Sequence, residues 1–351
     1  MSFPAFDMSV RAGRLVEERF GPISGLAVEE EPLVGGLEST SVERVTARFV
    51  DARGRRRSFA WVAKKVAPDQ TRELEIHRAI EGIACRGLAP DLLASDPLRD
   101  GGAVLHLEWV RPLRRWPWCE PETVTRVTRR FAEVHALLDD ELTEAGLAET
   151  WDYEAELAAS AEETLEVLQT LPPEAGELAG VRRARPAARR LVSALPEIRR
   201  QLLAWDGTGP VWIHGDLHPG NVVLRRREGR SVPTLLDWAR VRRGSVLEDL
   251  SSWNLSLCQW EPSAPRRHDR VLRSYLEGRN GGGSTASAGL ASSFRDAYWL
   301  AAASNALSGA LRYQLLVWNE ATTPRRRGDA LCAAEGWARA VRRADQRWRQ
   351  G

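Results

Sequence analysis

The stretch VWIHGDLHPGNVVL (residues 211–224) carries the most informative pattern of the chain. Two apolar runs, VWI and NVVL, enclose a polar loop that contains Asp216 and Asn221, and the glycines and proline of this loop permit a tight turn. A further apolar run ends at Asp237 in PTLLDWARVRRG (residues 233–244). The polar residues between the last two runs predict a hairpin, which would return Asp237 toward Asn221.

These three side chains match the requirements of phosphoryl transfer. Its transition state needs little covalent help, so catalysis depends on positioning and on the neutralisation of charge. One carboxylate must accept the proton of the attacking hydroxyl, and oxygen ligands must hold Mg²⁺. Asp216, Asn221 and Asp237 supply such a set. Isolated aspartates usually cap helices or occupy turns, but the joint spacing with Gly244 disfavours that interpretation.

The motifs HGDLHPGN (214–221) and LLDW (235–238) resemble those of the aminoglycoside phosphotransferase and choline kinase-like family. Members of that family are distant relatives of protein kinases. The resemblance implies that Asp216 is the catalytic base and that Asn221 is a Mg²⁺ ligand. It also implies that Asp237 is the principal Mg²⁺ ligand.

The resemblance continues at Gly244 and at Glu248-Asp249-Leu250. It implies that Asp249 supports the catalytic loop and takes no part in the reaction. His214 is interpreted as a packed residue that also supports this loop. His218 is interpreted first as an exposed loop residue and second as a substrate contact.

Residues 26–110 are predicted to be rich in strands, with one inserted helix. The β-rich runs at 42–50 and 57–66 flank a polar segment and therefore predict a hairpin. Residues 68–84 show the spacing of an amphipathic helix that follows a proline. Residues 103–110 return to a strand.

Beyond Arg111 the sequence predicts helices, interrupted by the catalytic and metal-binding hairpin within residues 210–250. The helices are expected at residues 121–145, 151–170, 181–205, 246–259, 264–277, 288–320 and 326–349. Together with the resemblance, this pattern predicts an α+β, bilobal, protein-kinase-like fold. Its nucleotide-binding lobe is expected at residues 1–110, and its mostly helical lobe at residues 111–351.

The resemblance also implies ATP-binding residues in the N-terminal lobe. Gly35 and Gly36, in LVGGLESTS, resemble the glycine-rich turn of the family, where backbone N–H groups approach phosphates. Ser39 or Ser41 is the candidate phosphate contact on the same turn.

Lys64 and Lys65 lie on opposite faces of a strand, so only one of them can point toward the nucleotide. The family's pattern favours Lys64 as the phosphate-binding lysine, whereas alignment with the V-A-I-K pattern of protein kinases favours Lys65. Glu73, on the following helix, matches the acid that would pair with this lysine. Glu75 is the alternative.

The segment LHLEWV (105–110) resembles the connection between the two lobes of the family. The resemblance implies that the backbone at Glu108 and Val110 forms hydrogen bonds with the adenine edge. Side-chain identity matters little for such contacts. ATP with Mg²⁺ is expected to bind between the lobes.

The composition excludes several other classes of protein. Hydrophobic residues make up 43% and charged residues 28%, and the formal charge of +2 gives no basic excess for nucleic-acid binding. The four cysteines form no CxxC pair, which argues against a zinc site. No secretory signal and no membrane-spanning segment are recognised. We therefore expect a cytoplasmic protein with no nucleic-acid or membrane partner.

The sequence thus predicts an ATP- and Mg²⁺-dependent small-molecule O-phosphotransferase. The resemblance to the family implies that its acceptor is a hydroxyl of an antibiotic or related sugar-containing metabolite. A primary-metabolite kinase of the choline or amino-alcohol type is one alternative. A non-catalytic nucleotide-binding scaffold is another, although Asp216, Asn221 and Asp237 are all present. A protein kinase is disfavoured, because the segment between Asp237 and Glu248 is too short for a peptide-docking loop.

Two further regions are open to two interpretations. The acidic runs at 139–150 and 154–167 would suit a cationic acceptor, but solvated helix faces are favoured. Tyr298, Asn305 and Arg312, on an apolar helical stretch, are possible acceptor contacts. Core packing is favoured for each of them.

Overall fold

The computed structural model describes residues 7–33, 41–112, 117–149, 151–205, 209–227, 229–261, 263–279 and 292–350. The chain divides into two compact units. The sheet unit comprises Met1–Arg114, Glu141–Leu147 and Val223–Arg240, and the helical unit comprises Arg115–Asp140, Ala148–Val222 and Val241–Gly351. The boundary expected after residue 110 stays a prediction.

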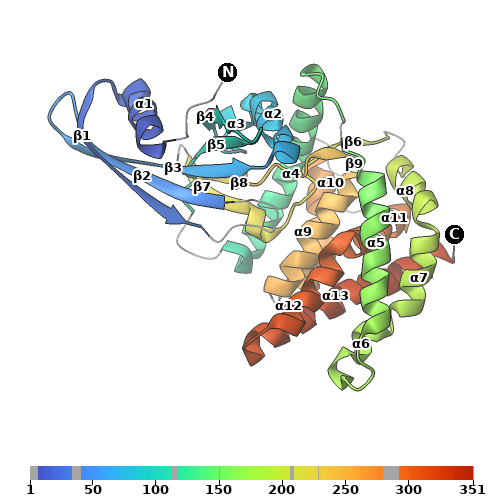
Figure 1. Ribbon diagram of the computed structural model, residues 1–351. Coiled ribbons are helices and arrows are strands. Elements are labelled where there is room, and N and C mark those ends of the chain that lie inside the picture. Colours follow the sequence, from blue (N-terminus) through green and yellow to red (C-terminus); the bar gives the residue numbers. More distant parts are fainter. Residues whose placement is uncertain are drawn as a thin grey trace. The chain divides into compact units, whose positions relative to one another are not determined.

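The sheet unit is built, in its described residues, on a five-stranded antiparallel sheet of order β1-β2-β3-β5-β4 (Figure 1). Its strands are β1 (Ile23–Pro32), β2 (Ser41–Asp51), β3 (Arg56–Val66), β4 (Leu92–Pro97) and β5 (Ala103–Glu108). The hairpin β2–β3 agrees with the sequence analysis, while β1 and β4 were not predicted individually. A separate two-stranded sheet joins β7 (Val222–Arg227) to β8 (Arg230–Leu235).

Helix α1 (Met8–Phe20) covers one face of the sheet (Figure 1). Asp7 caps it by accepting hydrogen bonds from the N–H groups of Ser9 and Val10. Its buried side chains join a core with apolar residues of β2, β3 and β5; they are Met8, Ala12, Leu15 and Val16. The sequence analysis did not predict this helix.

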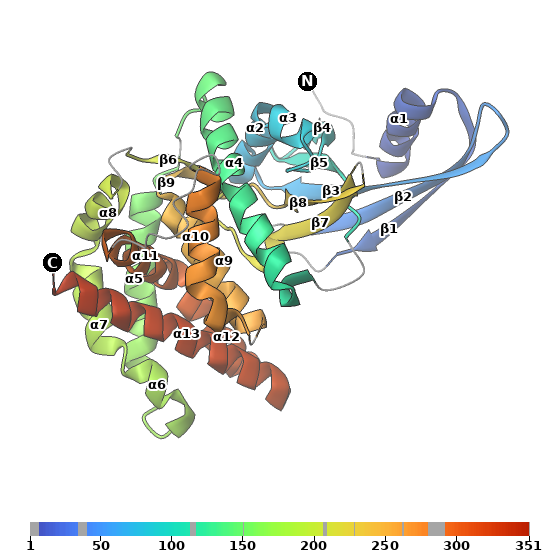
Figure 2. The same cartoon turned by 180° about the vertical axis from the view of Figure 1, so that it is seen from behind.

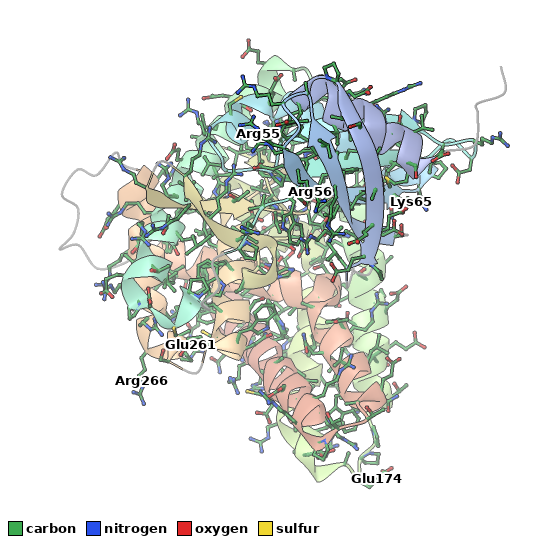
Figure 3. The ribbon with its side chains drawn as sticks, turned by 90° about the vertical axis from the view of Figure 1, so that its left-hand side faces the viewer. Arg55, Arg56, Lys65, Glu174, Glu261 and Arg266 are labelled. Atoms are coloured by element: carbon green, nitrogen blue, oxygen red, sulfur yellow. The ribbon has the colours of Figure 1, made fainter. Side chains whose placement is uncertain are left out.

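The two faces of β3 pack differently. Trp61 and Ala63 belong to the core under α1. Because side chains alternate along a strand, Lys64 lies on the opposite face, with Val66. Lys65, labelled in Figure 3, shares the face of Ala63.

The helix expected at residues 68–84 is divided into shorter pieces, which is a correction to the sequence analysis. They are a 3₁₀ turn at Pro68–Gln70, α2 (Arg72–Ala79) and α3 (Glu81–Cys85). Ile80 interrupts the helical path with φ −95° and ψ 28°, and its buried side chain packs into the sheet unit. Tertiary packing at Ile80 therefore overrides the continuous amphipathic pattern.

The helical unit follows the predicted order of elements. Its helices are α4 (Pro121–Glu144), α5 (Tyr153–Thr170), α6 (Ala179–Arg182), α7 (Arg185–Ser193), α8 (Leu195–Ala204), α9 (Val246–Trp260), α10 (His268–Arg279), α11 (Ser292–Asn305), α12 (Leu311–Glu320) and α13 (Pro324–Trp348). A short sheet pairs β6 (Val211–Ile213) with β9 (Arg242–Gly244). The segment expected as one helix at 181–205 is three helices, with a proline in the first turn of α7 and of α8.

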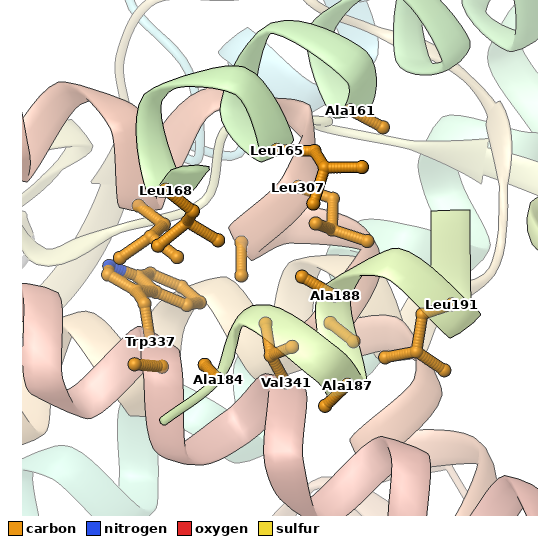
Figure 4. Close-up of a cluster of buried hydrophobic side chains, with 14 of the residues drawn as sticks. Ala161, Leu165, Leu168, Ala184, Ala187, Ala188, Leu191, Leu307, Trp337 and Val341 are labelled. Atoms are coloured by element: carbon orange, nitrogen blue, oxygen red, sulfur yellow. The ribbon is translucent and has the colours of Figure 1, made fainter. Parts of the chain in front are cut away.

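The main core of the helical unit lies between α5, α7 and α13 (Figure 4). It includes Leu165, Leu168, Ala184, Ala188, Leu191, Trp337 and Val341. Alanines allow the helices to approach closely, while Trp337 fills the remaining space. The predicted α+β class, with one β-rich and one mostly helical part, is confirmed. Within the described ranges, no helix combines the length and apolar character that a membrane span requires.

Candidate active site

The HGD loop of the helical unit follows β6 and is held by Asp249, in the first turn of α9. One Asp249 oxygen accepts the N–H of His214 at 2.8 Å, and the other accepts the N–H of Gly215 at 2.9 Å. The His214 ring in turn accepts the N–H of Asp216 at 3.3 Å. Asp249 and His214 thus support the loop, as the sequence analysis expected.

Asp249 is itself held by a network that the sequence analysis did not identify. His135 of α4 lies 3.0 Å from Asp249 through Nε2 and 2.8 Å from the hydroxyl of Tyr275 through Nδ1. Figure 2 shows α4 beside α10, which carries Tyr275. Burial alone would raise the pKa of Asp249, but the hydrogen bond to His135 and nearby positive groups outweigh burial and lower it. No local pattern marks His135 or Tyr275, because they are far from the motif in the sequence.

Asp216 and Asn221 contact each other on this loop. The Asn221 amide donates to Asp216 Oδ2 at 3.0 Å and to the Asp216 carbonyl at 3.0 Å. This bonding turns the amide oxygen of Asn221 away from Asp216. Among the described residues, the partners of the Asp216 carboxylate gather on Oδ2, and Oδ1 forms no hydrogen bond. The Asp216 side chain is 38% exposed, so Oδ1 can receive a hydroxyl from a bound molecule.

Gly244 is required by close packing. A Cβ atom at this position would lie 2.6 Å from Ile213 Cδ1 and 2.7 Å from Glu248 Oε2. Glu248 is buried between the guanidinium groups of Arg199, at 2.6 Å, and Arg242, at 3.1 Å. The spacing of Gly244 and Glu248 in the motif therefore reflects how β9 and the start of α9 pack beside β6.

In the sheet unit, Lys64 connects two carboxylates. Its Nζ lies 2.8 Å from both oxygens of Glu73 and 2.7 Å from Asp237 Oδ1. Burial would lower the pKa of Lys64, but the charges of Glu73 and Asp237 overcome burial and raise it. Of the alternatives left open by the sequence, Lys64 and Glu73 form the ion pair. The alternation along β3 explains why Lys65 does not take this position.

Asp237 lies just after β8, and its conformation is unusual. Its φ of 60° is the single positive value among the described non-glycine residues. The preceding strand is anchored to residues before β4: Leu235 N–H donates to the Leu88 carbonyl at 2.8 Å, and the Thr234 hydroxyl to the Gly87 carbonyl at 2.7 Å. The Asp237 side chain is 38% exposed and therefore accessible to a ligand.

His77 lies beside this ion pair and was missed by the sequence analysis. Its Nε2 is 3.9 Å from Glu73, and neither ring nitrogen forms a hydrogen bond within the described residues. Burial, with a smaller effect of the Lys64 charge, lowers the pKa of His77 to about 3. The only sequence signal was its position one helical turn after Glu73.

The other predicted nucleotide contacts are only partly described. Gly35, Gly36 and Ser39 lie outside the described residues. The Glu108 side chain, at the end of β5, forms an ion pair with Arg225 at 2.6 Å. Val110 is buried.

Several possible acceptor contacts have structural roles instead. Tyr298 is buried, Asn305 donates to the Glu248 carbonyl at 2.7 Å, and Arg312 pairs with Glu163. In the acidic runs, Asp139 accepts the N–H of Trp212 at 3.0 Å, and Glu154 pairs with Arg199. The contacts of Tyr298, Asn305 and the acidic runs agree with the favoured interpretations. The core packing favoured for Arg312 is wrong, because its side chain is partly exposed and forms an ion pair with Glu163.

The donor groups suit Mg²⁺. This ion prefers oxygen ligands, keeps several waters and is usually held by one or two carboxylates together with substrate phosphates. Asp237 offers an accessible carboxylate, and the hydrogen bonds of Asn221 leave its amide oxygen available. Over the described ranges, no three His, Cys, Asp or Glu side chains gather as a metal-binding group.

Comparison with known proteins places these motifs in context. A model of the phosphotransferase enzyme family matches residues 29–285. No curated protein matches the sequence significantly.

Several solved structures are similar to this chain. A candidate aminoglycoside phosphotransferase from Ralstonia eutropha JMP134 is 15% identical, with a TM-score of 0.59; the alignment covers 95% of this chain and 97% of that one. An ethanolamine kinase from Plasmodium vivax is 9% identical, with a TM-score of 0.55 and coverage of 91% and 83%. A spectinomycin phosphotransferase in complex with ADP and spectinomycin is 11% identical, with a TM-score of 0.54 and coverage of 97% and 99%. At such identities the likeness shows the fold, and the predicted protein-kinase-like fold is confirmed.

Proposed function

Because this chain belongs to the phosphotransferase enzyme family, its reaction is phosphoryl transfer, and we propose that it is an ATP- and Mg²⁺-dependent kinase of a small-molecule hydroxyl. The acceptor that we propose is an antibiotic or a related sugar-containing metabolite. The arrangement of Asp216 supports this proposal most directly. Asn221 engages one carboxylate oxygen, and the other faces no protein donor in the described structure.

In the proposed reaction, Asp216 is the catalytic base. Its Oδ1 accepts the proton of the acceptor hydroxyl while the hydroxyl oxygen attacks the γ-phosphorus of ATP. A bond forms between this oxygen and phosphorus, and the bond from phosphorus to the β–γ bridging oxygen breaks. ADP leaves with the bridging electron pair. Asp249 contributes by holding the backbone of the loop that carries Asp216.

Asp237 and Asn221 are the proposed Mg²⁺ ligands. The ion, when bound, would neutralise negative charge on the phosphates. Lys64 is the proposed phosphate-binding lysine, because its ammonium group stays protonated beside Glu73. Asp237 contacts Lys64 in this structure, so binding of Mg²⁺ and phosphate would redistribute the partners of both side chains.

The remaining nucleotide contacts are also proposals. Gly35, Gly36 and Ser39 would cover the phosphates, and the backbone at Glu108 and Val110 would bind adenine. We assign this role to an N-terminal lobe at residues 1–110 and acceptor binding to residues 111–351. The proposed site of action is the cytoplasm.

The test is ATP consumption with Mg²⁺ across aminoglycosides, nucleoside antibiotics, choline-like alcohols and sugars, with a control that lacks acceptor. Turnover of one acceptor class is expected, and Asp216→Asn should lower kcat about 100- to 10,000-fold while Mg·ATP binding is retained. Asp269→Asn is a matched control, because Asp269 is an exposed aspartate of the helical unit that pairs with Arg295. Substantial turnover by Asp216→Asn would remove the base assignment, and absence of Mg·ATP binding by the wild type would contradict the proposed function.

A further inference from the structure

An ion pair connects the end of β5 to β7 within the sheet unit. Arg225 Nη1 donates to Glu108 Oε1 at 2.6 Å. The Arg225 side chain is only 12% exposed, and its Nε is buried and forms no hydrogen bond within the described residues. Burying a guanidinium group carries a desolvation cost, and an apolar pair of similar size often stabilises a fold equally well. Stability alone therefore does not account for a charged pair at this position.

The backbone of Glu108 is held on a second side. Its N–H donates to the Asp91 carbonyl, just before β4, at 2.8 Å. The N–H of Asp91 lies 3.5 Å from Glu108 Oε2, so the side chain of Glu108 also faces this segment. Because its N–H is occupied, the backbone of Glu108 can offer a bound base only its carbonyl, which is a hydrogen-bond acceptor.

The β7–β8 hairpin also fixes the segment that precedes β4. Two groups of β8 donate to the carbonyls of Gly87 and Leu88. From β7, the guanidinium groups of Arg225 and Arg227 lie over Gly87, where a Cβ atom would come within 2.8 and 2.7 Å of their Nη atoms, respectively. The φ of Gly87, 76°, is one that glycine adopts readily. One hairpin thus holds Glu108 directly, through Arg225, and indirectly, through this segment.

A fixed acceptor at the end of β5 can distinguish between purine bases. Adenine carries an exocyclic amino group where hypoxanthine and guanine carry a carbonyl. An acceptor that cannot move binds this amino group and is left facing another acceptor when the base is hypoxanthine. Glu108 is the last residue of β5, and the described residues that follow, 109–112, belong to no strand or helix. Contacts of Glu108 itself therefore decide where its carbonyl lies.

We propose that Arg225 is a positioning residue for the choice of base. By pairing with Glu108 it holds the carbonyl of Glu108 in place, so that the chain prefers adenine nucleotides to hypoxanthine nucleotides. This inference rests on the proposed contact between the Glu108 backbone and adenine. Arg225 needs no contact with the nucleotide for this role. If the ion pair only stabilised the fold, its loss would weaken the binding of every nucleotide by the same factor.

The experiment measures the affinities of ATP and ITP by calorimetry, with Mg²⁺ and without acceptor, on the full chain. The two nucleotides share the ribose and the triphosphate and differ in the base. We expect the wild type to bind ATP more tightly. Arg225→Met should lower the ratio of the two affinities about 2- to 10-fold, which corresponds to one hydrogen bond. Glu108→Gln, which weakens the pair from the other side, should lower the ratio in the same direction. Arg225→Lys keeps the charge and should retain more of the preference.

Arg226→Met is the matched control, because Arg226 is an exposed arginine on the other face of β7. It should leave the ratio unchanged. An unchanged ratio in Arg225→Met, or equal affinities of the wild type for ATP and ITP, would overturn the inference. If denaturant unfolding shows that Arg225→Met is not folded, Arg225→Lys and Glu108→Gln decide by the same criterion. Mg·ATP binding without a preference for the base contradicts this inference alone, whereas absence of nucleotide binding by the wild type contradicts the proposed function as well.

Discussion

Two ionic clusters, one in each unit, differ in their exposure to solvent. The Asp249 cluster of the helical unit consists of Asp249, His135, Tyr275 and the backbone N–H groups of His214 and Gly215. The lysine cluster of the sheet unit consists of Lys64, Glu73, His77 and Asp237. Every side chain of the first cluster is buried, whereas the second extends to the 38% exposed carboxylate of Asp237.

This difference separates an enclosed acid, which supports a loop, from an acid that a ligand could reach. Both oxygens of Asp249 accept hydrogen bonds from the loop, so no ligand can reach Asp249 without breaking them. Lys64 is held between a buried acid, Glu73, and an accessible one, Asp237. Burial, strong pairing and position in a motif are thus insufficient to identify a reactive group. To select a candidate ligand-binding group, contact with an accessible carboxylate is a more useful criterion than burial or strong pairing.

The largest expected effect on stability comes from removing the acid of the Asp249 cluster. Asp249→Ala leaves two backbone donors and His135 without their acceptor in a buried site, and should cost about 3–5 kcal/mol of unfolding free energy. Asp249→Asn keeps one acceptor oxygen and should cost less. Denaturant unfolding followed by fluorescence measures both variants. A cost below about 1 kcal/mol for the alanine variant would show that the two clusters do not differ as described.

Removal of Lys64 should have the next largest effect. Lys64→Met leaves Glu73 buried without its cation, which should cost about 3 kcal/mol. In Lys64→Met/Glu73→Leu both partners are apolar, and much of the lost stability should return. The same unfolding measurement compares the single and double variants. If the double variant is as unstable as the single one, an uncompensated Glu73 is not the cause of the loss.

His77 gives the lysine cluster a specific dependence on pH. Its pKa is lowered from 6.5 to about 3, so below pH 6.5 the unfolded chain takes up a proton that the folded chain does not. Stability should therefore fall by about 1.4 kcal/mol for each pH unit between pH 6.5 and 3 from this group alone. In His77→Leu, the free energy of unfolding should fall less steeply with decreasing pH, by about 1.4 kcal/mol per pH unit. Identical slopes in the two proteins over this range would exclude His77 as the source.

The smallest expected change in stability comes from the exposed end of the lysine cluster. Asp237→Ala removes an accessible carboxylate and should change the unfolding free energy by less than about 1 kcal/mol. The same variant should lose Mg²⁺-dependent ATP binding, measured by calorimetry with and without Mg²⁺. Unchanged Mg·ATP affinity would show that Asp237 is not the metal ligand.

The sequence predicted elements well where the signal is local. The hairpin of β2 and β3 follows from two β-rich runs around a polar turn, and α9 follows from the helical pattern of residues 246–259. Asp216, Asn221 and Asp249 could be proposed as site and support residues because the motif places them close together in the chain. Helix α1 was not predicted, although Asp7 is a standard N-cap residue.

The sequence could not decide questions that depend on packing. Both faces of β3 carry apolar residues, so alternation alone does not tell which of the two faces carries the lysine that pairs with Glu73. His135 and Tyr275 come from helices far from the motif, and only the tertiary structure brings them to Asp249 and to each other. Trp260 was one of fourteen tryptophans. Its exposure and its neighbour His218 distinguish it from the others only in three dimensions.

Helix α9 contacts the HGD loop from two places. Asp249 in its first turn binds the backbone of His214 and Gly215, and Trp260 at its end contacts the ring of His218. An α-helix advances about 1.5 Å and turns roughly 100° with each residue. Insertion or deletion of a single residue in the middle of α9 would therefore redirect the Trp260 ring without altering the hydrogen bonds of Asp249. A change in the length of this helix would therefore alter the surface at its end while the support of the HGD loop by Asp249 stays in place.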